Sequence, residues 1–317
     1  MDKSRKIIVS ILALLTLSAV LAIVDITLTM KKKARSPYGI TAPKFGPGVG
    51  VVRLSGAIEF SSDSVSPLVK SGSTESVLRR LEELEKDSNI KAIVLRINSP
   101  GGTVAATQEI YGKLQALRKK NIILVASMGD VAASGGYYAA SACNHIMANH
   151  GTITGSIGVI AVSPNLKGLF EKLGIRMNVI KSGKYKDLLS SFREISPEER
   201  ALVQEMIDSS YNKFLKDVSL GRNIPISDIQ PYADGRVMNG ETALKYKLID
   251  EIGTFEMALA RAREKAKLPE DAPVYDDVKN PLDQFFMTLD GMAQKGGGLE
   301  RRVGLRDYYM LEYRYQP

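Results

Sequence analysis

Residues 91–103 read KAIVLRINSPGGT, and this stretch decides the class of fold. Ala92–Ile97 is a run of aliphatic side chains broken only by Arg96, which is typical of a strand buried in a parallel sheet. The Pro-Gly-Gly that follows is a turn signal, and a helix-forming stretch, Thr103–Leu117, opens directly after it. A strand, a tight turn and a helix in this order predict one unit of an α/β protein.

The same alternation continues along the chain on both sides. The sequence therefore predicts an α/β fold whose parallel strands are joined by right-handed crossovers. Two further helices are expected: Thr74–Lys86, with apolar residues at i, i+4 and i+7, and Pro197–Leu220, with Ser196 as its N-cap. The expected strands are Val49–Leu54, Ala92–Ile97, Ile122–Ala126, His145–Ala148, Ile157–Val162 and Met177–Ile180.

The N-terminal segment, residues 1–33, is expected to be a membrane anchor with basic flanks. Ile7–Val24 contains no charged residue, which meets the usual length of a helix that spans a bilayer. A cleaved signal peptide and a buried helix are the alternatives, but the apolar stretch is longer than a typical signal core, and Lys31–Lys33 follow it. Basic residues flank both ends, so the positive-inside rule leaves the orientation open.

Charge and composition bound the rest of the chain. The formal net charge of +8 lies mainly around the N-terminal segment, where it suits anionic lipid head groups rather than nucleic acid. A Pro- and Gly-rich linker is expected over residues 34–48, a folded domain over 49–276 and a tail over 277–317. The tail ends in DYYMLEYRYQP, which is either a packing or irregular tail or a peptide that docks on a neighbouring subunit.

The segment Asp130–Ala140, DVAASGGYYAA, is the first candidate for chemistry. Ser134 stands among small residues that permit a tight turn into a helix, and Gly135 lets its backbone N–H approach a ligand closely. N–H groups at a helix N-terminus can hold an oxyanion. Gly101 or Gly102 of the NSPGGT turn can present a second donor. The plain alternatives are a helix-capping serine and an ordinary strand-to-helix turn.

The segment Lys181–Ser190, KSGKYKDLLS, supplies candidate bases. A lysine accepts a proton near neutral pH only if its pKa falls from about 10.4 towards about 7–8. Apolar surroundings and nearby positive charge lower it, and Lys186 is followed by Leu188 and Leu189. A solvated basic loop is the alternative. Ser156, in the Gly-rich stretch TITGSIGVI, is either a further site residue or a turn serine.

A histidine base and a cysteine nucleophile are less suited to this sequence. The two histidines, His145 and His150, lie shortly after Ser134 around one expected strand, whereas a Ser-His-Asp triad needs a histidine that faces the nucleophile. Cys143 lies in an apolar stretch without a cationic neighbour. Neither the histidines nor Cys143 is therefore favoured as base or nucleophile.

Five segments together closely resemble the signal peptide peptidase A family, in its short, single-domain bacterial form. Their order and spacing add to the resemblance, with roughly 22 residues from Ser134 to Ser156 and roughly 52 from Ser134 to Lys186. The similarity runs from about Val49 to Ala266. The segments are NSPGG, DVAASGGYYAA, TGSIGVI, SGKYKDLLSSFREISPEE and GRVMNGETALKYKLIDEIG.

The resemblance implies a ClpP/crotonase-like fold of repeated ββα units and a role for each site residue. Ser134 matches the family's nucleophile and Lys186 its general base. Ser156 matches the serine that hydrogen-bonds and orients the lysine ammonium. The backbone N–H groups of Gly101 and Gly135 match the oxyanion hole.

The family further implies a serine endopeptidase with a Ser-Lys dyad that degrades cleaved signal peptides without a metal or organic cofactor. Members form ring- or dome-shaped oligomers on the outer face of the cytoplasmic membrane, and in the short type the serine and lysine can come from adjacent subunits.

Two alternative functions stay open. A crotonase-like acyl-CoA enzyme shares the Gly-rich oxyanion turns but has little use for an anchor. A catalytically inactive membrane scaffold conflicts with the intact pair Ser134 and Lys186.

Overall fold

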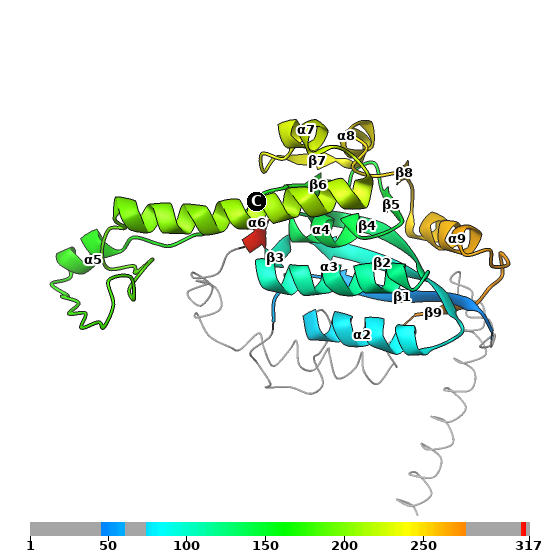
Figure 1. Cartoon of the computed structure of the whole chain (residues 1–317), viewed down its shortest axis with the longest axis horizontal. Coiled ribbons are helices and arrows are strands. Elements are labelled where there is room, and N and C mark those ends of the chain that lie inside the picture. Colours follow the sequence, from blue (N-terminus) through cyan, green and yellow to red (C-terminus); the bar gives the residue numbers. More distant parts are fainter. Residues whose placement is uncertain (1–45, 61–73, 277–311, 315–317) are drawn as a thin grey trace, which may run out of the picture. The chain divides into compact units, whose positions relative to one another are not determined.

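The aliphatic runs of the sequence form the central sheet of the computed structural model, which describes residues 46–60, 74–276 and 312–314 (Figure 1). The 8-stranded sheet follows the order β7-β6-β4-β2-β1-β9, and β5 and β8 extend it from β4. Neighbouring strands run parallel except β6 and β7. The strands are β1 Gly48–Ser55, β2 Ile90–Ser99, β4 Ile123–Ala133, β5 His145–Ala148, β6 Ile153–Gly155, β7 Val237–Asn239, β8 Glu251–Ile252 and β9 Val274–Tyr275.

Helices cover both faces of this sheet. On one face, Leu81, Ile110 and Phe214 from three helices pack into a core with the strands. On the other face, Leu259 packs against Val94. The helices are α2 Thr74–Lys86, α3 Val104–Lys119, α4 Gly135–Ser141, α5 Lys167–Lys172, α6 Pro197–Arg222, α7 Ile226–Ile229, η1 Gln230–Tyr232, α8 Gly240–Lys245 and α9 Phe255–Lys265.

The three expected helices are present as α2, α3 and α6, with bounds that differ from the prediction by at most two residues. Ser196 caps α6 as predicted. Its hydroxyl accepts a hydrogen bond from the Glu199 amide at 3.2 Å, and the Glu199 carboxylate accepts one from the Ser196 amide at 2.9 Å. This reciprocal capping box satisfies two donors that the first helical turn would otherwise leave unpaired.

Two of the six expected strands are wrong. Ile157–Val162 and Met177–Ile180 are not strands of the structure. Ile157 is buried, but strand β6 ends before it, at Gly155, and Val162 is exposed. The side chain of Ile180 is fully exposed. The apolar composition of these two runs therefore does not reflect a place in the sheet of this chain.

A second, two-stranded sheet lies at the NSPGG turn. There β10 (Glu312–Arg314) pairs antiparallel with β3 (Gly101–Thr103), so that Arg314 stands opposite Gly101. On the other side of β3, Gly102 forms a parallel bridge with Ile58. A Cβ on Gly102 would stand 1.9 Å from the Ile58 carbonyl oxygen, so only glycine fits between these neighbours.

Within the described ranges of the chain, no helix is both long and apolar enough to cross a bilayer. The expected anchor over residues 1–33, with its uncharged stretch Ile7–Val24, lies outside the described residues. So do most of the expected linker over 34–48 and most of the tail over 277–317.

Candidate active site

Ser134 lies between the end of β4 and the start of α4 in a strained backbone conformation. Its φ is 52° and its ψ is −115°, a combination that a residue other than glycine adopts only at a cost of about 1–3 kcal/mol. Its amide donates a hydrogen bond of 2.8 Å to the Gly155 carbonyl, and its carbonyl accepts one of 2.8 Å from the Tyr138 amide. The Ser134 hydroxyl does not cap α4. The turn therefore leaves this hydroxyl unused by the helix that follows it.

Ser156 lies next to Ser134 because the strands that precede the two serines are paired. Ala133 and Gly155 stand opposite each other in the parallel register of β4 and β6, and each serine is the next residue. Ser156 also has a positive φ, 51°, and its amide donates to the Arg236 carbonyl at 2.8 Å. Open parallel sheets bind ligands at the carboxyl ends of their strands, which is where both serines lie.

The two glycines expected to hold an oxyanion lie at the same end of the sheet. Gly135 is the first residue of α4, where a backbone N–H has no acceptor within the helix. Gly101 has a φ of 101°, and its N–H donates to the Ser99 hydroxyl at 3.1 Å. A Cβ on Gly136 would stand 2.8 Å from the Ser99 carbonyl oxygen, so α4 packs directly on the NSPGG turn.

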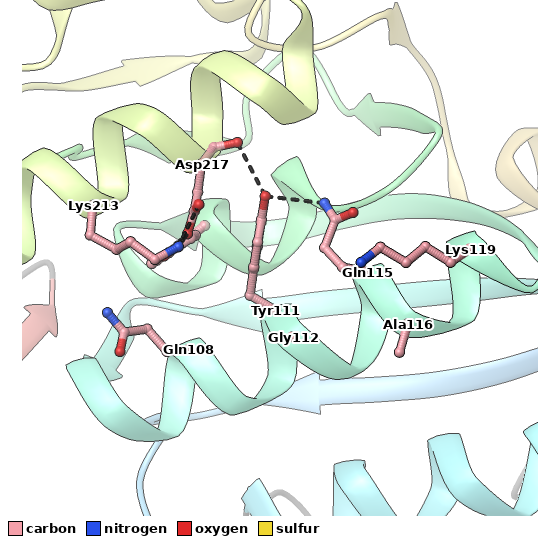
Figure 2. A pocket seen from close by; sticks show the side chains of 9 residues that line it. Gln108, Tyr111, Gly112, Gln115, Ala116, Lys119, Lys213 and Asp217 are labelled. Atoms are coloured by element: carbon pink, nitrogen blue, oxygen red, sulfur yellow. Dashed lines mark hydrogen bonds and ion pairs between the residues drawn. The ribbon is translucent and has the colours of Figure 1, made fainter.

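A hydrogen-bonded cluster around the buried Asp217 fixes α4 against α6 and α3, and Figure 2 shows the contacts of Asp217 with Tyr111 and Lys213. The hydroxyl of Tyr138 donates to the Asp217 carboxylate, and its ring stacks on Phe214 with 4.5 Å between ring centres. Lys213 donates to the same carboxylate at 2.5 and 2.6 Å, and the Tyr111 hydroxyl donates to the Asp217 carbonyl at 3.2 Å. Asp217 is only 4% exposed, so Lys213 compensates a largely desolvated charge.

This cluster borders a hollow of about 360 Å³ between α3 and α6 (Figure 2). Gln108, Gln115 and Lys119 line its α3 side, and Lys213 and Asp217 line its α6 side. Ser134 is not among the lining residues. The hollow is therefore separate from the turn that carries the expected nucleophile.

Lys186 is not brought to Ser134 within one chain. It lies in the segment between α5 and α6, which Figure 1 places at the N-terminal end of α6, away from α4. Lys186 is exposed, whereas Ser134 is 1% exposed. In this structure of one copy, the segment that carries Lys186 therefore lies apart from the turn that carries Ser134.

The other two lysines of this segment have acidic partners. The Lys184 ammonium donates to Glu198, and this hydrogen bond raises the pKa of Lys184. Lys181 donates to Asp187 at 2.5 Å. A carboxylate partner favours the protonated amine, so Lys184 is not suited to be a base. Of the lysines at 181, 184 and 186, only Lys186 has no acidic partner among the residues that the structure describes.

The two histidines lie next to carboxylates and the cysteine is buried, which suits structural roles. His145 lies 3.1 Å from a carboxylate oxygen of Glu251, and His150 lies 3.0 Å from one of Glu241. Cys143 is buried, and burial raises the pKa of its thiol to about 12, so a thiolate is strongly disfavoured. These contacts agree with the expectation that none of the three supplies the nucleophile or its base.

Sequence reasoning did not single out Asp217 or Arg193, although both hold elements of the site in place. Asp217 follows Lys213 by four residues, a spacing that by itself predicts only a surface pair on a helix. Nothing local indicates that Tyr138, 79 residues earlier, reaches this carboxylate. Arg193 stands three residues before Ser196, the N-cap of a helix whose first turn is acidic. This arginine close to acidic residues was the one local signal for an ion pair at this position.

Comparison with known proteins agrees with this geometry. A sequence model of peptidase family S49 matches residues 116–269, and a model described as Clp protease matches residues 64–153. A Synechocystis protein named "Putative protease slr0021" is 46% identical over 230 residues, which make up 73% of this chain and 82% of that protein.

Two further relatives carry more specific names. The protein named "Serine protease SPPA, chloroplastic" of Arabidopsis thaliana is 34% identical over 265 residues, 82% of this chain but 39% of that protein. The protein named "Putative signal peptide peptidase SppA" of Enterococcus faecium is 36% identical over 211 residues, 67% of this chain and 61% of that protein.

These matches favour a peptidase over the acyl-CoA enzyme and the inactive scaffold. The Clp protease match overlaps β2, β3, α3 and β4, and it assigns the observed sheet and helices to a ClpP-like α/β fold. The S49 match covers Ser134, Ser156 and Lys186. The chain therefore belongs to peptidase family S49, the signal peptide peptidase A family, and is a serine peptidase with a ClpP-like fold that acts on peptides.

Proposed function

We propose that this chain is a membrane-anchored serine endopeptidase in which Lys186 of one copy activates Ser134 of a second copy. One pairing of features carries the proposal. Ser134 is held in a strained turn at the carboxyl end of the sheet, and Lys186, exposed on another part of the chain, has no acidic partner among the described residues. Ser134 offers a hydroxyl that needs a base, and Lys186 offers an amine without an acidic partner. The two lie apart in one chain, so a second copy would have to bring them together.

The chemistry proceeds by acyl transfer. The Ser134 hydroxyl attacks the peptide carbonyl carbon while the neutral Lys186 amine takes its proton, and the resulting ammonium protonates the leaving amine. Water then attacks the acyl ester and gives a proton to the Lys186 amine. The ester bond breaks, the ammonium returns this proton to the Ser134 oxygen, and the carboxylic acid is released. Ser156 holds the ammonium in place. The N–H groups of Gly135 and Gly101 stabilise the oxyanion, each by about 3 kcal/mol, once Gly101 releases the Ser99 hydroxyl.

Exposed apolar side chains in the segment that carries Lys186 support contact with a second copy. Five large side chains in this part of the chain are between 46% and 62% exposed or completely exposed, which is unusual for a monomeric protein. A partner that covers these side chains would also shield the Lys186 amine from water, and apolar surroundings favour the neutral form of an amine. A head-to-tail contact of this kind closes into a ring when the rotation between successive copies is a simple fraction of a full turn. The five are Leu169, Leu173, Ile175, Met177 and Ile180.

The anchor and the relatives point to the substrates. Ile7–Val24 is uncharged and long enough to span a bilayer, so the peptidase domain over residues 49–276 would work at a membrane surface. The name of the Enterococcus relative refers to signal peptides, which are extended and hydrophobic. We place the chain in the cytoplasmic membrane with the peptidase domain outside the cytoplasm, where it degrades released signal peptides.

The test is complementation between two inactive variants. Ser134→Ala and Lys186→Ala, each alone, should lose cleavage of a fluorogenic hydrophobic peptide. When the two proteins are co-expressed, a Ser134→Ala copy supplies Lys186 to the intact Ser134 of its neighbour. Random mixing in a head-to-tail ring then restores about a quarter of the sites. The measurement is the rate per subunit, with the oligomer mass checked for every sample.

Two results would contradict parts of the proposal. Full activity of Lys186→Ala removes the dyad altogether. Inactive mixed oligomers, with both single variants inactive, leave the dyad in place but require serine and lysine from one chain. Deletion of residues 1–33 tests the anchor separately, because the truncated protein should leave the membrane fraction and keep its peptidase activity in detergent-free buffer.

A further inference from the structure

The segment that carries Lys186 has no apolar core beneath it. Every residue from 171 to 186 is exposed, and α5 buries none of its side chains. Hydrophobic burial, the main source of order in folded chains, is therefore missing here. Within one chain, a defined position for Lys186 must therefore come from polar contacts.

Arg193 makes most of these contacts where the segment joins α6. Its guanidinium donates to both carboxylate oxygens of Asp187 at 2.9 Å and to the Asp187 carbonyl at 3.0 Å. It also donates to the two carboxylate oxygens of Glu199 at 2.8 and 2.5 Å. Glu199 is buried and closes the capping box with Ser196. Arg193 therefore joins the residue next to Lys186 to the start of a 26-residue helix.

The charges of this cluster keep it ionised at neutral pH. The hydrogen bonds from Arg193 lower the pKa of Asp187 far below its usual range and that of Glu199 to about 2. The two carboxylates in turn raise the pKa of Arg193. Isolated surface ion pairs contribute little to stability, but bidentate networks with fixed geometry are the exception. This network has that geometry on both sides of one guanidinium.

We propose that Arg193 is a positioning residue for the general base, because it fixes the backbone of the turn that presents Lys186 to Ser134 of the second copy. The inference rests on the proposed Ser-Lys function and adds a residue to it. Arg193 touches neither reacting atom and acts through Asp187. A lysine at this position could not replace it, since an ammonium lacks the planar fork that holds two carboxylates and a carbonyl in set directions.

The experiment compares Arg193→Lys, Arg193→Gln and the control Arg261→Gln. Arg261 is matched in exposure, 33% against 30% for the Arg193 side chain, and it also binds a glutamate, Glu251, through two nitrogens. It lies on α9, away from the proposed site. A fluorophosphonate probe, allowed to react to completion, counts the competent Ser134 hydroxyls. The kcat for a fluorogenic peptide is then expressed per labelled serine.

We expect both Arg193 variants to lower kcat per labelled serine by roughly 100-fold, the effect of misplacing a catalytic group by about 1 Å, with little change in KM. All serines should still become labelled, more slowly than in the unmodified protein. Arg261→Gln should match the unmodified protein in kcat, KM and labelling.

Two results overturn the inference. The first is a normal kcat per labelled serine in Arg193→Lys, which would mean that charge alone suffices. The second is a loss confined to the number of labelled serines or to the oligomer mass, which would mean that Arg193 only maintains the fold. Lys186→Ala separates this inference from the proposed function. If that variant is inactive while Arg193→Lys is normal, the dyad survives and only the positioning role fails.

Discussion

The amide of Ser134 donates a hydrogen bond of 2.8 Å to the carbonyl oxygen of Gly155, so the turn that carries the nucleophile is held by the neighbouring strand. Gly155 has a φ of +78°, and a Cβ there would stand 3.1 Å from the Arg236 carbonyl oxygen. Both the backbone angle and the close neighbour favour glycine. The geometry of Ser134 therefore depends on a residue that takes no part in the chemistry.

Replacing this glycine should disturb the nucleophile directly. Gly155→Ala forces a side chain into a positive-φ position, at a cost of about 1–3 kcal/mol in the free energy of unfolding. The same strain shifts the carbonyl that fixes Ser134, so labelling by a fluorophosphonate should slow. Urea denaturation and labelling rates measure the two effects. Gly151→Ala is the control, because a Cβ at Gly151 meets no atom within 4 Å. Equal behaviour of the two variants would contradict the prediction.

The carboxylate of Asp217 is buried, so it should contribute more to stability than an exposed ion pair with the same i, i+4 spacing. Asp217→Asn removes the charge that Lys213 and Tyr138 both bind, and hydrogen bonds to a charged group are worth about 1.5–3 kcal/mol. We expect a loss of that size in the free energy of unfolding by urea. Asp208→Asn, on the exposed face of the same helix, should change it by less than about 0.5 kcal/mol. A small change for Asp217→Asn would mean that the cluster in Figure 2 contributes little net stability.

Acid should loosen the start of α6 through Glu199. Hydrogen bonds from Arg193 and from the Ser196 amide lower its pKa from 4.5 to about 2 in the folded protein. The stabilisation is fully present above about pH 4.5 and is lost as the pH falls towards 2, because the unfolded form takes up the proton first. Asp187, whose pKa Arg193 also lowers, acts in the same direction.

Hydrogen exchange measures this loss locally. Amides of residues 181–203 should exchange faster as the pH falls from about 4.5 to 2, after correction for the intrinsic rate. Amides of α3, none of whose described residues hydrogen-bonds to Arg193, Asp187 or Glu199, should keep their protection over the same range. In Glu199→Gln the pH-dependent step at residues 181–203 should become smaller. An unchanged step would assign the acid sensitivity to other carboxylates.

Local signals in the sequence predicted the elements that depend on local physics. The aliphatic run Ala92–Ile97 became the centre of β2, and the Ser-Pro-Glu-Glu signal at Ser196 became a capping box. Ser134 was expected at a turn into a helix, and α4 begins at the next residue. These features need only neighbours within a few residues, so composition and spacing were sufficient to find them.

Relationships between distant residues could not be predicted in this way. Met177–Ile180 has the composition of a strand, but its apolar side chains are exposed in this chain. An apolar run favours burial, but it does not specify whether the same chain or a second copy buries it. The spacing from Ser134 to Lys186 supported the family resemblance but contained no information on whether one chain joins them. The contact of Tyr138 with Asp217 depends on how α4 and α6 pack, which neither segment specifies alone.

The pairing of β10 with β3 gives a last prediction, about access to the site. β10 lies along the strand that contains Gly101, one of the proposed oxyanion donors, and an extended peptide substrate would add to an exposed strand edge in the same way. A chain that lacks residues 312–317 should therefore have a lower KM for a peptide substrate and an unchanged kcat. The fall in KM is about twofold if the effective concentration of the tail equals its dissociation constant, and larger if the tail binds more tightly.

Steady-state kinetics measure both KM and kcat, and a synthetic peptide of residues 309–317 should restore the higher KM when added to the truncated protein. If KM is the same with and without the last six residues, the tail does not compete with substrate, and the strand pairing serves only the fold.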